Sequence, residues 1–180
     1  MNANPAPSPA SPVSSASSAS PARILLLHGP NLNLLGERDR ATYGSTTLRD
    51  IEERTTALGA ELGAEVRCAQ SNSEGALIDL VHSTRTGDDG IVFNPGAYAH
   101  YSYALRDALE AVAGLGVPCV EVHISNVHAR ETFRHTSVTA PVCQGMVSGH
   151  GDFGYELALR SVLHRVAEWR AAGTARSARG

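Results

Sequence analysis

The chain contains no lysine: all 15 of its positively charged side chains are arginine. Without a lysine amine, the protein cannot form a Schiff base with a carbonyl substrate. A phosphate-binding P-loop is excluded as well, because that loop needs its lysine. Use of arginine throughout is typical of a GC-rich genome, but the two chemical exclusions hold whatever its origin.

Other features that the chain lacks narrow the class of protein further. No apolar stretch approaches the roughly 20 residues of a membrane span, so we expect no membrane partner. The net charge of −3 provides no basic surface for nucleic acid. The three cysteines, Cys68, Cys119 and Cys143, have no Cys-x-x-Cys spacing. Cys68 and Cys119 lie in apolar, strand-like segments, so we expect both to be buried and reduced, with a cytoplasmic location and no metal site.

The two ends of the chain lack the apolar residues that a core requires. Residues 1–21 are almost wholly Ala, Ser, Pro and Asn, and such a segment cannot bury enough surface to offset its ordering entropy. We therefore expect a disordered N-terminal extension, which also lacks the pattern of a secretory signal. Residues 171–180 are predicted to be a flexible tail. One domain, residues 22–170, remains between them.

Within this domain, short apolar runs alternate with amphipathic helical patterns. The predicted strands are Arg23–His28, Glu65–Gln70, Gly90–Asn94, Val117–His123 and Gly145–Gly149. The predicted helices are Thr47–Leu62, Ser73–Arg85, His100–Ala113, Glu131–Phe133 and Phe153–Arg170. Strands separated by helices of this length indicate βαβ units and a parallel sheet. We expect an α/β fold, a flavodoxin-like three-layer sandwich with a five-stranded parallel sheet.

In such sheets ligands bind beyond the carboxyl ends of the strands, so polar residues at those ends are candidates for a site. The first strand is followed by a loop, residues 29–44, that carries Asn31, Arg38 and Tyr43. A phenol has a pKa near ~10 and becomes a base at neutral pH only where a cation stabilises its ionised form. Tyr43, with Arg38 five residues before it in the same loop, is therefore a candidate base; the alternative is a strand-to-helix turn with an exposed tyrosine.

The fourth strand ends with Glu121 and His123. Side chains alternate along a strand, so these two share one face. A carboxylate beside an imidazole favours the protonated ring and holds one tautomer, as a general acid requires. The alternative is that His123 is a buried histidine whose hydrogen bonds are satisfied within the core.

Further polar groups follow the third and fourth strands. Asn94 closes the third strand, and His100 and Asp107 are seven residues apart, so they would share one face of a helix. Arg130 and Arg134 would also share a face, or would instead form a solvated surface with Glu131. Taken together, these groups predict a polar, anion-accepting pocket capable of acid–base chemistry on a carboxylate or a polyol. The residues alone do not specify a reaction.

Three segments together resemble the type II 3-dehydroquinate dehydratases. They are Gly29-Pro-Asn-Leu-Asn-Leu-Leu-Gly36 with Tyr43-Gly44, then Asn94-Pro-Gly-Ala-Tyr-Ala-His100, then Glu121-Val-His-Ile-Ser-Asn-Val-His-Ala-Arg130 with Phe133-Arg134. The similarity extends in order from Arg23 to Arg165, nearly the whole predicted domain. Type I enzymes use a lysine Schiff base, so the missing lysine independently agrees with type II.

The resemblance implies a flavodoxin-like hydro-lyase that converts 3-dehydroquinate to 3-dehydroshikimate by anti elimination of water through an enolate. The reaction would use no metal and no organic cofactor. It would serve the shikimate pathway to chorismate and the aromatic amino acids, or quinate catabolism. The resemblance also implies a homo-oligomer, a dodecamer built from trimers.

Roles are transferred by matching position. Tyr43 would be the base and Arg38 would lower its pKa, while Asn31 would hold a water against the enolate oxygen. His123 would be the general acid, with Glu121 orienting it. Substrate would be bound by Asn94, His100, Asp107, Ile124, Ser125, Arg130 and Arg134, with Asp107 supplied by a neighbouring subunit.

The match is imperfect in the first loop. His28 stands where the family commonly has Asn, and Asp39-Arg40 replaces the usual Glu-Pro. Loss of the proline frees backbone conformations, so we expect a more mobile loop that retains activity.

Two other classes of function are alternatives to this one. A flavodoxin-like module for a flavin or phosphate has only the fold in its favour, and fold does not imply function. Gly29-Pro30 also removes an N–H donor that a phosphate would use. A hydrolytic metal site would take His123 and His128 with Glu121, but histidines five apart do not match the helical spacing of zinc sites.

Overall fold

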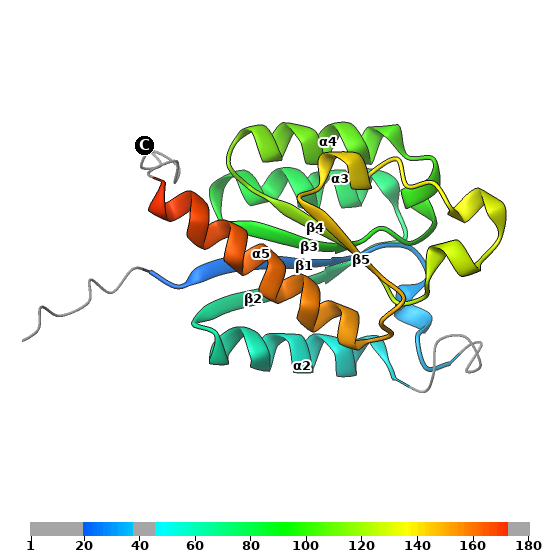
Figure 1. Cartoon of the computed structure of the whole chain (residues 1–180), viewed down its shortest axis with the longest axis horizontal. Helices are drawn as coiled ribbons and strands as arrows, with labels where there is room; N and C mark the ends of the chain where they lie inside the picture. The colour runs from blue at the N-terminus through cyan, green and yellow to red at the C-terminus, as the bar shows by residue number, and fades with distance from the viewer. Residues whose placement is uncertain (1–19, 38–45, 173–180) are drawn as a thin grey trace, which may run out of the picture.

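A five-stranded parallel sheet forms the centre of the protein (Figure 1). The computed structural model describes residues 20–37 and 46–172. Every neighbouring pair of strands runs parallel, in the order β2-β1-β3-β4-β5. This is the strand order of flavodoxin-like folds, so the predicted fold class is confirmed. The strands are β1 (Ala22–His28), β2 (Ala64–Gln70), β3 (Gly90–Asn94), β4 (Cys119–His123) and β5 (Gly145–Ser148).

Two helices cover each face of the sheet, which gives the three layers seen in Figure 1. Alternation along β1 sends Ile24 and Leu26 into one core and Leu25 and Leu27 into the other. A central parallel strand is buried on both faces, which is why its sequence is a continuous apolar run. The first core includes α2 (Leu48–Glu61) and α5 (Phe153–Ala171), and the second includes α3 (Glu74–Ser83) and α4 (Tyr103–Gly114).

Side-chain caps define where the helices begin. Thr47 and Asp50 form a reciprocal capping box at the start of α2, and Ser73 accepts a hydrogen bond from the backbone of Ala76 at the start of α3. Asp152 is the N-cap of α5, where its carboxylate accepts the N–H of Phe153 at 3.0 Å.

The helix predicted over His100–Ala113 is wrong at its start. Residues Gly96–His100 form a 3-10 helix, η3, and α4 begins only at Tyr103, where the buried Ser102 hydroxyl caps the N–H of Leu105 at 3.0 Å. His100 and Asp107 therefore do not share one helical face. The short helix predicted over Glu131–Phe133 is a 3-10 turn, η5, over Thr132–Arg134.

One further boundary and one burial prediction need correction. The fourth strand begins at Cys119 rather than Val117, after Pro118. Cys119 is buried as predicted, whereas Cys68 is exposed. Cys68 lies on β2, an edge strand of the sheet, so the apolar segment around it is only partly covered. Among the described residues, no helix has the length and apolar character to cross a bilayer.

Candidate active site at the carboxyl ends of the strands

A cavity of about 240 Å³ lies at the carboxyl ends of β1, β3 and β4. Its volume suits a small metabolite rather than a dinucleotide. Most of the sequence-predicted site residues that the structure describes meet there. The lining residues with polar side chains are Asn31, Asn94, His100, His123, Ser125, Arg130 and Arg134, and Ile124 lies among them.

Two loops that carry site residues pack against each other without space for side chains. A Cβ atom on Gly29 would lie 2.5 Å from the carbonyl oxygen of Pro95, and the Gly29 N–H donates to the Asn94 carbonyl at 2.7 Å. On the opposite side, Gly96 has a φ of +57° and faces the backbone of Pro30. Only glycine permits this approach, which fixes the loop after β1 against the loop after β3.

Asn31 holds an uncommon backbone conformation, with a φ of 66°. It precedes the 3-10 helix η1 (Leu32–Leu34), and its backbone N–H donates to the side chain of Asn72 at 2.8 Å. Asn72 is held in turn, because its side-chain oxygen accepts from Gln70 and its carbonyl accepts from the hydroxyl of Tyr98. These contacts fix the position of Asn31 at the edge of the cavity.

The predicted pairing of Glu121 with His123 is present in the structure. His123 Nε2 lies 2.7 Å from Glu121 Oε1, and Glu121 is fully buried. The hydroxyl of Ser137 also donates to Oε1, at 2.8 Å, and that of Thr139 donates to Oε2 at 2.6 Å. A buried carboxylate is stable only when it accepts such hydrogen bonds, and three partners fix its plane.

This arrangement determines which nitrogen of His123 is available. Nε2 donates to Glu121, so Nδ1 is the atom that can exchange a proton with a molecule in the cavity. His123 itself lines the cavity and is only 6% exposed. The contact with Glu121 therefore fixes the orientation of the imidazole and favours its protonated form, and in that form Nδ1 carries the proton that a general acid donates.

Two arginines give the cavity its positive charge. Arg130 donates to the Ser125 hydroxyl at 3.2 Å, and Arg134 donates to Glu131 at 2.8 Å. Arg130 Nε also lies 3.4 Å from the same Glu131 carboxylate. The pKa of Glu131 is lowered by its own backbone N–H and then by Arg134. The expected contact of both arginines with Glu131 is therefore present, while both guanidinium groups also line the cavity. Their binding of an anion stays a prediction.

Asn94 and His100 come from the segment after β3. Asn94 is 3% exposed; its Nδ2 donates to the hydroxyl of Tyr155 at 2.8 Å, and its Oδ1 accepts the Gly96 N–H at 3.1 Å. Nδ1 of His100 lies 2.9 Å from the carbonyl oxygen of Thr136. Both side chains line the cavity with their orientation already fixed by the protein.

Two of the predicted site residues that the structure describes, Glu121 and Asp107, do not line this cavity. Asp107 is exposed on α4 and is absent from the cavity wall. Arg38 and Tyr43 lie outside the described residues.

Sequence reasoning missed the residues that support the site. Asn72 follows the end of β2, so the strand-end rule that located the other groups applied to it as well. Ser137, Thr139 and Tyr155 are separated from their partners by 16, 18 and 61 residues. No local pattern in the sequence indicates these contacts.

Among the described residues, no three His, Cys, Asp or Glu side chains gather in a way that would hold a metal ion. The residues of the alternative metal site, Glu121, His123 and His128, all fall within this part of the chain and do not form such a group. The described groups can instead bind an anion and donate a proton to it.

The strand order and the position of the cavity define the class of protein, a flavodoxin-like α/β enzyme with an acid–base site beyond the carboxyl ends of its sheet. Comparison with known families is more specific: the family described as "Dehydroquinase class II" matches residues 22–163. The chain belongs to this family.

Comparison with individual relatives agrees with this family assignment. The chain is 55% identical over 139 residues to a protein of Pelotomaculum thermopropionicum named 3-dehydroquinate dehydratase, which covers 77% of this chain and 94% of the relative. A protein of Desulforudis audaxviator with the same name is 54% identical over 144 residues, 80% of this chain and 94% of the relative. The crystal structure of type II dehydroquinase from Butyrivibrio crossotus superposes with a TM-score of 0.78 at 46% identity, covering 81% of this chain and 99% of the other.

Proposed function

We propose that this chain is a hydro-lyase that removes water from 3-dehydroquinate to give 3-dehydroshikimate. The observation that carries the proposal is the buried Glu121–His123 pair, in which His123 lines a cavity that also contains two arginines. Membership of the class II dehydroquinase family and relatives named 3-dehydroquinate dehydratase support the same substrate.

The elimination needs two proton transfers on opposite faces of the substrate ring. A base takes the proton alpha to the ketone, and the electrons of that C–H bond form an enolate. The enolate then expels the hydroxyl at the beta carbon, which leaves as water once an acid has protonated it. The product is an enone, in which the new double bond is conjugated with the ketone.

His123 is the acid in this scheme, through Nδ1, and Glu121 orients it. Each positioned proton transfer of this kind contributes typically ~100- to 10,000-fold to the rate. Tyr43 is the base, with Arg38 lowering its pKa. Asn31 holds a water against the enolate oxygen and so stabilises the charge that develops there. The roles of Tyr43, Arg38 and Asn31 are transferred from the family resemblance.

The remaining polar groups bind the substrate in this proposal. The carboxylate binds at Ile124 and Ser125, whose segment follows β4, with the charge of Arg130 and Arg134 nearby. Asn94 and His100 bind ring hydroxyls. A buried amide presents both a donor and an acceptor, which suits a hydroxyl group that can do the same.

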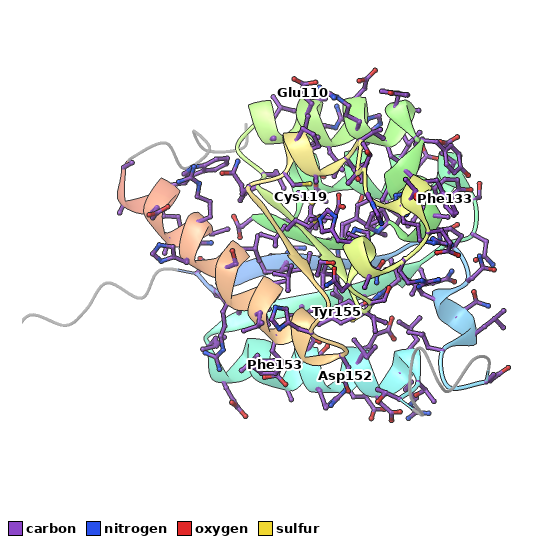
Figure 2. The ribbon with its side chains drawn as sticks, turned by 45° about the vertical axis from the view of Figure 1, so that its right-hand side comes forward. Glu110, Cys119, Phe133, Asp152, Phe153 and Tyr155 are labelled. Carbon is purple, nitrogen blue, oxygen red and sulfur yellow. The ribbon has the colours of Figure 1, made fainter. Side chains whose placement is uncertain are left out.

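The full assembly belongs to this proposal as well. We propose a dodecamer built as a tetramer of trimers, in which Asp107 of one subunit approaches the site of its neighbour. In support, Asp107 is exposed and lies away from the cavity of its own chain, and the aromatic side chains of Tyr101, Tyr103 and Phe133 are 59%, 64% and 61% exposed. Phe133 lies in the right-hand part of the molecule in Figure 2. We place the enzyme in the cytoplasm, in the shikimate pathway or in quinate catabolism.

The direct test is ultraviolet absorbance of the purified protein mixed with 3-dehydroquinate, after exhaustive chelation and without added cofactor. A growing band from the conjugated enone is expected. His123→Ala, purified and assayed in the same way, serves as the control for contaminating activity. A flat trace from folded wild-type protein would overturn the proposal.

A further inference from the structure

A chain of buried polar side chains leads from the cavity to helix α2. Asn94 Nδ2 lies 2.8 Å from the hydroxyl oxygen of Tyr155, which lies 3.4 Å from Nδ1 of His28. Nε2 of His28 lies 3.6 Å from a carboxylate oxygen of Glu52. Tyr155 and His28 are completely buried, and Figure 2 places Tyr155 near the start of α5. Four elements, β3, α5, β1 and α2, are thereby connected through polar groups within an otherwise apolar core.

The direction of each hydrogen bond in this chain follows from its surroundings. Oδ1 of Asn94 accepts the Gly96 N–H, so the amide nitrogen is the group that faces Tyr155. Since that nitrogen donates, the Tyr155 oxygen accepts, and the hydroxyl proton is left for His28 Nδ1.

His28 is able to accept that proton. Burial lowers its pKa from 6.5 to about 3, so the ring is neutral at physiological pH and carries its single proton on Nε2 when Nδ1 accepts. Its approach to Glu52 is therefore not an ion pair, and Nε2 has no hydrogen-bond partner among the described residues. Burial also raises the pKa of Tyr155, which keeps the hydroxyl protonated and able to donate.

We propose that Tyr155 is a positioning residue, held by His28, that fixes the amide of Asn94 for binding a substrate hydroxyl. Two anchors, the Gly96 N–H and the Tyr155 hydroxyl, define the amide plane and prevent exchange of its oxygen and nitrogen. One N–H and one lone pair of Asn94 then remain for the cavity. This inference rests on the proposed function, because it takes Asn94 as a ligand of the substrate.

The test is steady-state kinetics on a double-mutant cycle of Tyr155→Phe and Asn94→Ala. Tyr155→Phe retains the buried ring and removes only the hydroxyl. We expect KM to rise about tenfold, the equivalent of one hydrogen bond. We expect a much smaller change in kcat, because the lost contact is made equally in the ground and transition states. In the Asn94→Ala background, Tyr155→Phe should change KM little further, since the hydroxyl then has no amide to position.

Two further measurements separate positioning from general stability. Thr55→Val removes another buried hydroxyl, which donates to Ile51 within α2, and should lower stability without changing KM. His28→Leu removes the acceptor for Tyr155, whereas His28→Asn places an oxygen two bonds from Cβ, where Nδ1 now lies. His28→Asn should therefore raise KM less than His28→Leu.

The outcomes distinguish the two proposals. Absence of turnover by the wild-type protein would overturn the proposed function. Turnover by wild type, combined with additive effects of Tyr155→Phe and Asn94→Ala on KM, would overturn the positioning role alone. If Tyr155→Phe does not fold, equal KM values for His28→Leu and His28→Asn would overturn it by themselves.

Discussion

Glu121 is a single buried carboxylate whose hydrogen bonds determine what His123 can do. The imidazole and two hydroxyls donate to it, so it accepts from Nε2 and leaves Nδ1 to act on the substrate. We predict that His123→Ala lowers kcat by ~100- to 10,000-fold. Glu121→Gln should lower it by roughly 10- to 100-fold, because Gln keeps an acceptor for Nε2 but lacks the negative charge that strengthens this hydrogen bond and favours the protonated ring.

Stopped-flow or steady-state assays of enone formation check both values. Circular dichroism and size-exclusion chromatography establish that each variant is folded and assembled. A near-wild-type kcat for His123→Ala would remove this residue from the mechanism.

Among the elements of the fold, the loops after β1 and β3 depend most strongly on glycine. Gly29→Ala would bring a Cβ to within 2.5 Å of the Pro95 carbonyl oxygen, which is backbone and cannot rotate away. We predict a loss of about 1–3 kcal/mol in the free energy of unfolding and a higher KM, because Asn31 and Asn94 flank this contact. Gly75→Ala is the matched control: its Cβ would meet nothing within 4 Å, and alanine favours the helix. Equal stability of the two variants by urea titration would contradict the close packing of the loop after β1 against the loop after β3.

For the molecule as a whole, buried His28 predicts sensitivity to acid. Its pKa falls from 6.5 to about 3 on folding, so between these values the unfolded chain binds a proton that the folded chain does not. The contribution of neutral His28 to the free energy of unfolding is therefore fully present above pH 6.5. It declines as the pH is lowered toward 3, by at most about 1.4 kcal/mol per pH unit. Urea unfolding of wild type and His28→Asn at several pH values tests this, and the variant should lose less stability on acidification. Identical pH dependence in both proteins would refute it.

The assembled molecule provides another prediction. If Asp107 of one subunit completes the site of another, Asp107→Ala should raise KM although Asp107 lies outside its own cavity. Oligomers refolded from a mixture of Asp107→Ala and His123→Ala chains should then regain activity, because some sites combine an intact His123 with an intact neighbouring Asp107. Mixtures no more active than the two separate variants would contradict a shared site.

The parts of the site that the sequence predicted are those set by local geometry. Glu121 and His123 were paired from the alternation of a strand, and the structure places them 2.7 Å apart. The prediction for His100 and Asp107 failed because it assumed one helix, whereas the Ser102 cap starts α4 three residues after His100. The edge position of β2, which exposes Cys68, depends on strand order rather than on the apolar residues around the cysteine.

By itself the sequence determined the α/β class, the approximate positions of the strands and of the long helices, and the strand ends at which polar groups gather. These features follow from hydrophobic periodicity and short motifs, which act over a few residues. Only the tertiary structure decided that Ser137 and Thr139 hold Glu121, that Asn72 holds Asn31, and that Tyr155 and His28 hold Asn94. Each of these contacts joins chain segments brought together by packing of the sheet and its helices, and such long-range neighbours leave no periodic signal in the sequence.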